Sequence, residues 1–362
     1  MGDSQQADSY DALVVVSFGG PEAPDEVVPF LENVLRGRNV PRERMMQVAH
    51  HYELFGGVSP INGQNRALIA ALERELHESD LKLPVYWGNR NWHPLLADTI
   101  RRMRDDGIRR ALAFVTSAYS SYSGCRQYRE DIERAREAVG EGAPQIDKLR
   151  VFYNHPDFVA PNIENLQAAL AEIPAERRGD AHVAFTAHSI PLSMASTCDY
   201  QTQLLETCRL VAEGAGHARW QLVFQSRSGS PAQPWLEPDI CEHLRELKRS
   251  GATEVVVAPV GFISDHMEVL YDLDTEARQV SQEIGLNMIR AATVGTHPAF
   301  IKMIRELIVE RMTNDPVRRA LGTRGAKEDI CPADCCLMGA SRPAAAHTAN
   351  SARPALTNER SA

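Results

Sequence analysis

Short runs of β-branched and other apolar residues recur along the chain, each bounded by turn-forming residues. Such runs are typical of strands that are buried on both faces of a parallel sheet. We expect strands at residues 12–18, 84–88, 111–117, 149–153, 182–188, 220–226, 254–262 and 287–293. Between most of them apolar residues recur at helical spacing, as in 65–78, 95–107 and 239–251. This alternation predicts an α/β protein.

The two halves of the chain repeat one plan. Residues 106–123 and 250–266 align on Gly107 and Gly251, and each gives a helix end, a glycine, a buried strand and a polar loop. We therefore expect two similar Rossmann-like domains, each a four-stranded parallel sheet flanked by helices. The active-site cleft should lie between them, at the carboxyl ends of their strands. The expected division is a disordered N-terminus at 1–9, domains at 10–165 and 166–325, a cysteine motif at 326–336 and a disordered tail at 337–362.

Composition excludes several classes of protein. With 362 residues, 43% of them hydrophobic and 24% charged, the chain is typical of soluble globular proteins. Its net charge of −9 argues against a general nucleic-acid binder. The polar N-terminus and the short apolar runs predict neither an export signal nor a transmembrane segment, so we expect a cytoplasmic protein.

An acidic row follows the seventh expected strand. Glu268, Asp272 and Glu276 are four residues apart and would share one helix face. Like charges at this spacing repel by about 0.2–0.5 kcal/mol per pair, so the row suggests traffic of a cation or of protons. The alternative is a solvated acidic face.

Histidines at two strand ends could join this row. His188 ends the fifth expected strand and His266 follows the seventh, so both should converge with Glu268 on the cleft. Imidazole and carboxylate together suit Fe(II), Mn or Zn, and they could also move protons near neutral pH. A satisfied core histidine is the alternative for His188.

The N-terminal half offers groups for an anionic or flat ligand. Arg36 and Ser59 lie near the first strand–helix unit, where arginine and hydroxyl groups suit carboxylates or phosphates. A solvated basic loop is the alternative for the arginines. Tyr122, Tyr128 and Trp235 follow strand ends, where aromatic rings could line an apolar site or serve as ordinary packing. No Walker A motif or glycine-rich dinucleotide motif follows the first strand.

Three of the seven cysteines lie in the sequence CPADCC at 331–336. Thiolates this dense are typical of a soft metal or an iron–sulfur cluster, and a cluster would need a fourth ligand from elsewhere. A reactive cysteine-rich terminus is the alternative.

Six motifs in order resemble the ferrochelatase family, whose members insert ferrous iron into a porphyrin. They are SFGGPE, FGGVSPIN, WGNRNWHP, FTAHSIP, FQSRSGSPAQPWLEPD and GFISDHMEVLYDLD, between about residues 10 and 325. The resemblance implies the class II chelatase fold, with His188 and Glu268 as the facing pair where Fe²⁺ is inserted as substrate. Asp272 and Glu276 would extend the acidic path. The residues that it places near the porphyrin are Ser59, Tyr128, Tyr122, Arg36, His51, Tyr52, Arg90 and Trp235.

The chain looks most like the actinobacterial branch of this family, which uses coproporphyrin III. That likeness implies a lyase of haem synthesis and a [2Fe–2S] cluster held by Cys331, Cys335, Cys336 and Cys125, with Cys198 as the second choice for the internal ligand. Phe18 stands where relatives have Tyr, so Tyr122 is the candidate axial ligand. The alternatives are a protoporphyrin IX ferrochelatase, a cobalt or nickel chelatase, and a non-catalytic haem or porphyrin carrier. Transient contact with other haem-pathway enzymes stays open.

Overall fold

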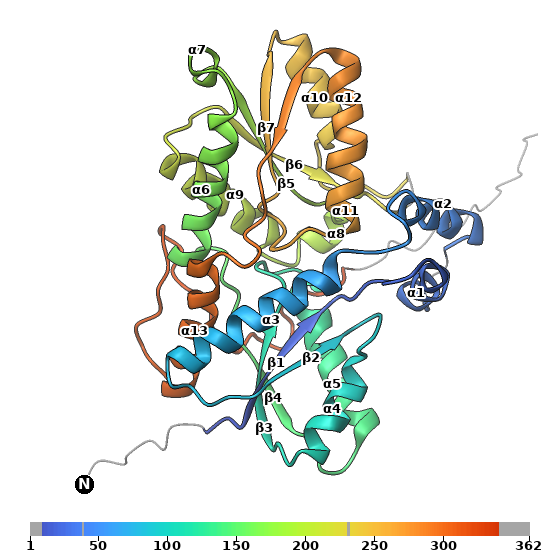
Figure 1. The fold of residues 1–362 in the computed structure, drawn as a ribbon, viewed down its shortest axis with the longest axis vertical. Helices are drawn as coiled ribbons and strands as arrows, with labels where there is room; N and C mark the ends of the chain where they lie inside the picture. The colour runs from blue at the N-terminus through green and yellow to red at the C-terminus, as the bar shows by residue number, and fades with distance from the viewer. Residues whose placement is uncertain (1–8, 38–39, 230–231, 340–362) are drawn as a thin grey trace, which may run out of the picture.

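The computed structural model describes residues 9–37, 40–229 and 232–339, which form two parallel four-stranded sheets stacked along the long axis of the molecule (Figure 1). The first sheet has the order β2-β1-β3-β4 and the second β6-β5-β7-β8, so both halves share one topology. This confirms the predicted repeat. The strands are β1 Ala12–Ser17, β2 Val85–Asn89, β3 Arg110–Val115, β4 Gln145–Lys148, β5 His182–His188, β6 Trp220–Gln225, β7 Glu254–Ala258 and β8 Asn287–Arg290.

Helices cover both faces of each sheet. In the first half they are α1 Val27–Val34, α2 Arg42–Glu53, α3 Ile61–Glu78, α4 Leu96–Asp105 and α5 Gln127–Val139, with a short 3₁₀ helix at Pro24–Glu26. They continue as α6 Pro156–Ala171, α7 Ala175–Arg178, α8 Leu192–Ala195, α9 Tyr200–Gly214, α10 Ile240–Arg249, α11 Met267–Val269, α12 Arg278–Ile284 and α13 Pro298–Thr313. Two π-helical turns, η2 Tyr122–Arg126 and η3 Leu270–Ala277, follow β3 and β7.

The central strand β1 shows why these segments become buried strands. All six of its residues are buried, and alternate side chains point to opposite faces of the sheet. Leu13 and Val15 join a core that continues into the second half, while Val14 and Val16 pack against α4 and α5. A continuous run of apolar residues therefore contributes side chains to two hydrophobic cores, one on each face of the sheet.

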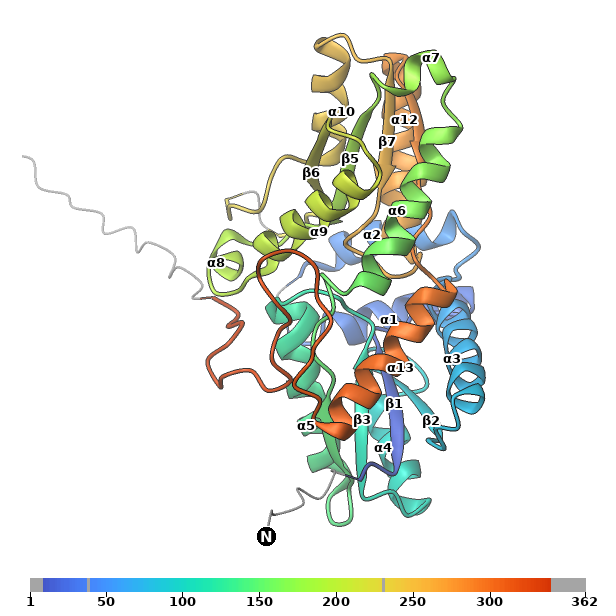
Figure 2. The same cartoon turned by 90° about the vertical axis from the view of Figure 1, so that its left-hand side faces the viewer.

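The last helix ties the two halves together. Helix α13 follows the second sheet in sequence but crosses back to pack against α3 and α6 (Figures 1 and 2). The expected boundary at residue 165 falls inside α6, which links the sheets. The ends expected to be disordered lie largely outside the described residues, at 1–8 and 340–362.

Three strand predictions need correction. The run at 149–153 is buried but is not a strand, because β4 lies at Gln145–Lys148 and the ladder ends where Leu149 N donates to Ala113 O at 2.9 Å. Beyond this point the apolar side chains still enter the core although the backbone has left the sheet. The strands predicted at 254–262 and 287–293 likewise end earlier, at Ala258 and Arg290.

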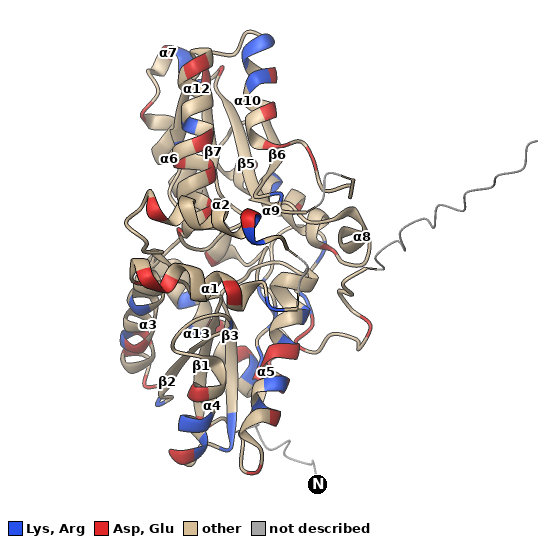
Figure 3. Cartoon of the chain, turned by 90° about the vertical axis from the view of Figure 1, so that its right-hand side faces the viewer, with Lys and Arg blue, Asp and Glu red and all other residues tan. Residues whose placement is uncertain are grey.

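Within the described residues, no helix has both the length and the apolar character to cross a membrane. Basic and acidic residues are interspersed on α4, α5 and α10 in the view of Figure 3. Mixed charge of this kind is ordinary for solvated helix faces.

Candidate active site

His188 and Glu268 face each other across the ends of two adjacent strands. His188 is the last residue of β5, and Glu268 lies in α11, just beyond β7, with His188 Nε2 3.4 Å from Glu268 Oε1. Their side chains keep 32% and 48% of their surface accessible, yet burial is the largest influence on the pKa of each. The predicted convergence of the two residues is confirmed, whereas their roles stay a prediction.

The pair is charged at neutral pH. Burial by itself would lower the pKa of His188, but the Glu268 carboxylate and the Ser189 carbonyl outweigh it and raise the pKa to about 9. Burial would raise the pKa of Glu268, but His188 lowers it to about 2. His188 Nδ1 is hydrogen bonded to Ser189 O, which leaves Nε2 toward Glu268. The imidazole must therefore lose a proton before it can accept a metal ion or another proton.

His266 is a neutral neighbour of this pair. Its Nδ1 accepts a hydrogen bond from Glu268 N at 3.1 Å and so caps α11, and it lies 4.0 Å from Glu268 Oε2. Burial, which disfavours charge, lowers the pKa of His266 despite the nearby carboxylate. The structure thus places all three expected groups together, with only one histidine protonated.

Two members of the acidic row, Asp272 and Glu276, lie on a π-helix and not on the α-helix that the spacing predicted, while Glu268 precedes them in α11. Residues 270–277 form η3, whose hydrogen bonds run from i to i+5. Its turn is wider than that of an α-helix, so residues four apart still lie on nearly the same face. π-Helical turns occur frequently at functional sites. The correction changes the helix type and keeps Glu268, Asp272 and Glu276 in one row.

Asp272 has the electrostatics of a proton-exchanging group. Burial raises its pKa, the hydrogen bond from Ser226 Oγ lowers it, and Glu268 and Glu276 raise it again, giving about 7. Gln225 Nε2 joins the row by donating to Glu268 O at 3.0 Å and to Asp272 Oδ2 at 3.4 Å.

The outer end of the row is covered by α2 from the first half. His51 stacks on Tyr271 with ring centroids 3.6 Å apart and planes 8° apart. Burial and Asp239 raise the pKa of Glu276, while Arg245 and Arg44 oppose them. Both halves therefore contribute to the surroundings of the acidic row.

Arg90 is fixed by its neighbours in the first half. Its guanidinium pairs with Asp131, and the two side chains are only 7% and 12% exposed. Its Cζ lies 4.5 Å from the ring centroid of Tyr128 and 5.8 Å from that of Phe18. An anionic ligand would have to compete with Asp131 for this cation.

The remaining predicted porphyrin residues differ in accessibility. Tyr128, Ser59 and Trp235 are buried, and Ser59 lies directly beneath Gly20. Arg36 is exposed after α1. Tyr52 is buried close to Glu268, since burial and then that carboxylate raise its pKa.

Two tyrosines pack near His188: Tyr200, which the sequence did not indicate as a site residue, and Tyr119, which follows β3 and could be expected either to line a ligand site or to serve as packing. Tyr200 is buried and its hydroxyl donates to His188 O at 3.0 Å. Tyr119 packs edge-on against Tyr200 and donates to Val260 O at 2.8 Å, which joins the loop after β3 to the loop after β7. Nothing in the local sequence distinguishes these rings from packing residues, but Gln225 and Ser226 could have been found as the polar end of β6.

The cysteine motif folds back onto the first half, where Cys125 lies. Cys331 and Cys336 lie close enough to Cys125 to be the largest influences on its thiol, and both lower its pKa. Cys335 Sγ lies 3.1 Å from Cys336 Sγ, and Cys336 has a φ of 56°, in the left-handed region. Cys198 is also near, because burial and then the charges of Asp199, Cys335 and Cys125 raise its pKa. The described structure gathers the predicted ligands, and a bound cluster stays a prediction.

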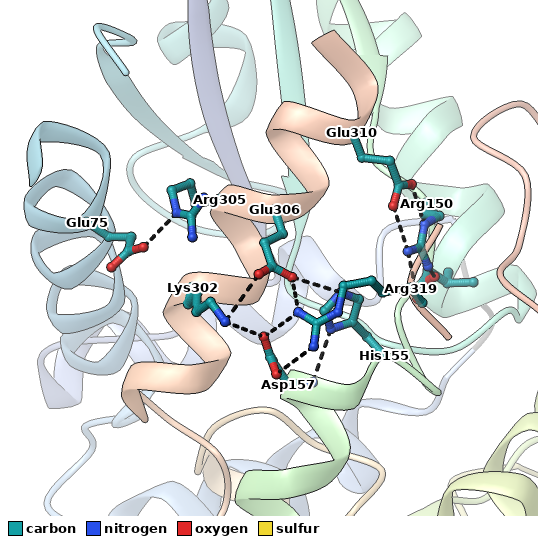
Figure 4. A network of polar contacts seen from close by, with 10 residues as sticks. Glu75, Arg150, His155, Asp157, Lys302, Arg305, Glu306, Glu310 and Arg319 are labelled. Carbon is teal, nitrogen blue, oxygen red and sulfur yellow. Dashed lines mark hydrogen bonds and ion pairs between the residues drawn. The ribbon is translucent and has the colours of Figure 1, made fainter. Parts of the chain in front are cut away.

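A second group with metal-ligand atoms lies far from this site and has its own cations. His155, Asp157 and Glu306 bring ligand atoms within 4.8 Å of one another where α6 meets α13. Figure 4 shows that Lys302 and Arg319 each contact both Asp157 and Glu306, so the two negative charges are already neutralised. We interpret this group as a structural network.

Comparison with known proteins gives a consistent picture. The sequence model of the ferrochelatase family matches residues 10–312. A ferrochelatase from Rhodopirellula baltica is 56% identical over 92% of this chain and 95% of that protein. Coproporphyrin III ferrochelatases from Streptomyces coelicolor and Nocardia farcinica are 53% and 49% identical, over 96% and 93% of this chain and 98% and 99% of theirs.

Among solved structures, SirB from Bacillus subtilis with Fe³⁺ superposes with a TM-score of 0.51. It is 13% identical and the match covers 84% of this chain and 97% of that one. At this identity the likeness concerns the fold alone, and it confirms the predicted chelatase architecture.

Proposed function

The chain belongs to the ferrochelatase family, and we propose that it inserts Fe²⁺ into coproporphyrin III with release of two protons. Membership indicates a metal-insertion enzyme. The names of the relatives support coproporphyrin III as the substrate. The product would be Fe-coproporphyrin III, an intermediate for haem, and the enzyme would be a lyase.

The observation that carries this proposal is the His188–Glu268 ion pair backed by Asp272. A free-base porphyrin must lose two pyrrole protons as iron enters, so the site needs both a cation-binding group and a proton acceptor. Glu268 carries its negative charge and is accessible. Asp272, with a pKa of about 7, can both gain and lose a proton near neutral pH. A porphyrin carrier would need neither group.

The electrostatics suggest an order of events. Fe²⁺ approaching Glu268 weakens the ion pair with His188, because metal ions and protons compete for the same ligands. The His188 proton can then leave along the acidic row, in which Asp272 is the group poised to take it. The free imidazole is next able to bind iron or accept a pyrrole proton. Binding energy from the propionates would offset the distortion of the macrocycle that exposes its nitrogen lone pairs.

Arginines on the first half support a substrate with four propionates. Arg42 and Arg44 lie on α2 and Arg36 just after α1, and all three are exposed. Guanidinium groups bind carboxylates in a bidentate manner. Coproporphyrin III has twice as many propionates as protoporphyrin IX, so it should gain more from these cations.

The cysteine residues fit a [2Fe–2S] cluster as the resident group. Cys125, Cys331, Cys335 and Cys336 would hold it, since Cys335 Sγ lies 3.1 Å from Cys336 Sγ, and Cys331 and Cys336, followed by Lys148, lower the pKa of the Cys125 thiol. Such a cluster supplies one-electron chemistry or a covalent cross-link between distant segments. No step of iron insertion requires it.

The decisive test is an anaerobic assay of the purified chain with Fe²⁺, following the free-base absorption bands of coproporphyrin III and protoporphyrin IX in parallel. Catalytic loss of the coproporphyrin bands alone is the expected result. Preference for protoporphyrin IX would retain the chelatase and overturn the substrate. Binding of either porphyrin without turnover would favour the carrier.

A further inference from the structure

The cysteine segment, residues 331–337, touches both halves of the protein beside the proposed active site. On one side Ala333 O and Cys335 O accept hydrogen bonds from Arg126 Nη1 at 2.7 and 3.0 Å. On the other side Leu337 O accepts from Thr197 Oγ1 at 2.6 Å. Thr197 lies between α8 and α9, shortly after His188 ends β5. Figure 2 shows the chain beyond α13 running past α5 and α8.

The π-helical turn η2 could connect the cysteine segment to the porphyrin site, because it contains residues that belong to each within a stretch of five. Tyr122 begins the turn, while Cys125 and Arg126 end it. Gly124 makes the turn tight, because a Cβ there would lie 2.7 Å from Ser117 Oγ and 3.2 Å from Tyr119 O. Cys125 is buried, whereas Tyr122 is partly exposed. A displacement of one end of so short a turn must move the other.

Glu130 connects the same two ends a second time, through side chains. Its Oε1 accepts a hydrogen bond from Arg126 Nε at 2.7 Å, and its Oε2 accepts one from the Tyr122 hydroxyl at 3.0 Å. Arg126 thus uses Nε for Glu130 and Nη1 for the cysteine segment. Only the fork of a guanidinium has donors in both directions at once.

We propose that Arg126 and Glu130 are positioning residues that couple the cysteine segment to Tyr122, so that holding the segment in place strengthens porphyrin binding. This rests on the proposed function for the placement of Tyr122 at the porphyrin. The coupling needs no displacement of the catalytic pair, because it acts on the opposite half of the site. It gives the cysteine residues a role in substrate affinity and not in the insertion step.

Coupling between two sites is reciprocal, and this provides the test. Full-length protein is treated with iodoacetamide with and without saturating coproporphyrin III, and alkylation of Cys331 and Cys335 is followed by peptide mass spectrometry. Porphyrin is expected to slow alkylation by about fivefold, the lower end of typical coupling. Protein alkylated at these positions should bind porphyrin more weakly by the same factor, measured by fluorescence quenching. In protein that carries a [2Fe–2S] cluster, its cysteine ligands become free for alkylation only when the cluster is released, so the same measurement follows that release.

Variants separate the connection from general stability. Arg126→Gln should abolish both effects because it releases the segment from Glu130. Glu130→Ala should abolish them while leaving the hydrogen bonds from Arg126 to the segment intact. Arg129→Gln is the matched control, since it removes the same charge next to Glu130 on the same helix and has no hydrogen bond to the cysteine segment among the described residues. Its coupling factor should equal that of the unchanged protein.

Each possible result either supports or overturns the proposed coupling. Porphyrin binding that leaves alkylation unchanged, or a coupling factor that survives both Arg126→Gln and Glu130→Ala, overturns the inference while the proposed function stands. If porphyrin does not bind the unchanged protein, the proposed function fails and this inference fails with it.

Discussion

The π-helical turns η2 and η3 occupy matching places after β3 and β7 but carry different chemistry. In the second half, η3 holds Asp272 and Glu276 behind the charged His188–Glu268 pair. In the first half, η2 holds Tyr122, Cys125 and Arg126 and faces the cysteine segment. A repeated fold thus places a π-helical turn at the same position in each half, and we propose that their side chains divide the work into ion handling in the second half and ligand positioning in the first.

The histidines of the two halves show the same division. His188 has a carboxylate partner that raises its pKa to about 9. Burial lowers the pKa of His155 to about 4, and Arg150 and Arg319 add to that effect. His155 is more deeply buried than His188, and this burial outweighs the nearby carboxylates of Asp157 and Glu306, so its pKa falls where that of His188 rises.

The largest expected effect follows from replacing His188 with alanine. The variant His188→Ala should lower kcat by about 10²–10⁴-fold, because it removes the group that exchanges a proton and faces Glu268. Porphyrin binding should be largely retained. Its counterpart Tyr122→Phe should raise KM and retain most of kcat. Equal loss of kcat in both variants, measured by porphyrin absorbance, would remove the division between the halves.

The neutral state of His155 predicts a pH-dependent stability. Its folded pKa of about 4 lies below the ordinary value of 6.5, so the unfolded chain takes up the proton first as pH falls. The free energy of unfolding should therefore decrease between pH 6.5 and 4, by up to about 3 kcal/mol from this group. His155→Asn keeps an N-cap for α6 but cannot titrate, so urea unfolding should show a shallower pH slope. An unchanged slope would contradict the assignment.

Substituting Gly261 in the second half or Gly124 in the first tests how much space the structure leaves for a Cβ at each position. A Cβ on Gly261 would lie 2.6 Å from Ala187 Cα and 3.0 Å from Thr186 O, and these backbone atoms precede His188. Gly261→Ala should cost about 1–3 kcal/mol of stability and also lower activity. At Gly124 the nearest atom is the hydroxyl of Ser117, which can rotate, so Gly124→Ala should cost less. Thermal unfolding and kcat measured together check this order.

The smallest expected effect is a shift in the pH dependence of activity, caused by changes within the acidic row. Ser226 Oγ donates a hydrogen bond to Asp272, which holds the pKa of that carboxyl down to about 7. Ser226→Ala should raise this pKa, so the acidic limb of the pH–rate profile should move to higher pH with a similar maximal rate. Asp272→Asn should remove the limb altogether. A profile that is unchanged in both variants would exclude Asp272 from proton transfer.

The sequence by itself determined the repeat, the parallel sheets and the convergence of His188 with Glu268. These follow from local patterns, because continuous apolar runs specify buried parallel strands and the strand ends of such sheets gather at one edge. The grouping of Cys331, Cys335 and Cys336 was equally local, since they lie within six residues.

Only the tertiary structure decided the features that depend on neighbours distant in sequence. The run at 149–153 has the composition of a strand, but the β3–β4 ladder ends before it. The π-helical form of residues 270–277 and the role of Tyr200 beneath His188 also have no local signal. The charge of His188 depends on the facing Glu268 carboxylate, and the neutrality of His155 depends chiefly on its burial. Side-chain electrostatics change within a few ångströms, whereas hydrophobic patterning is averaged over a whole element, and so the fold was predictable where the protonation states were not.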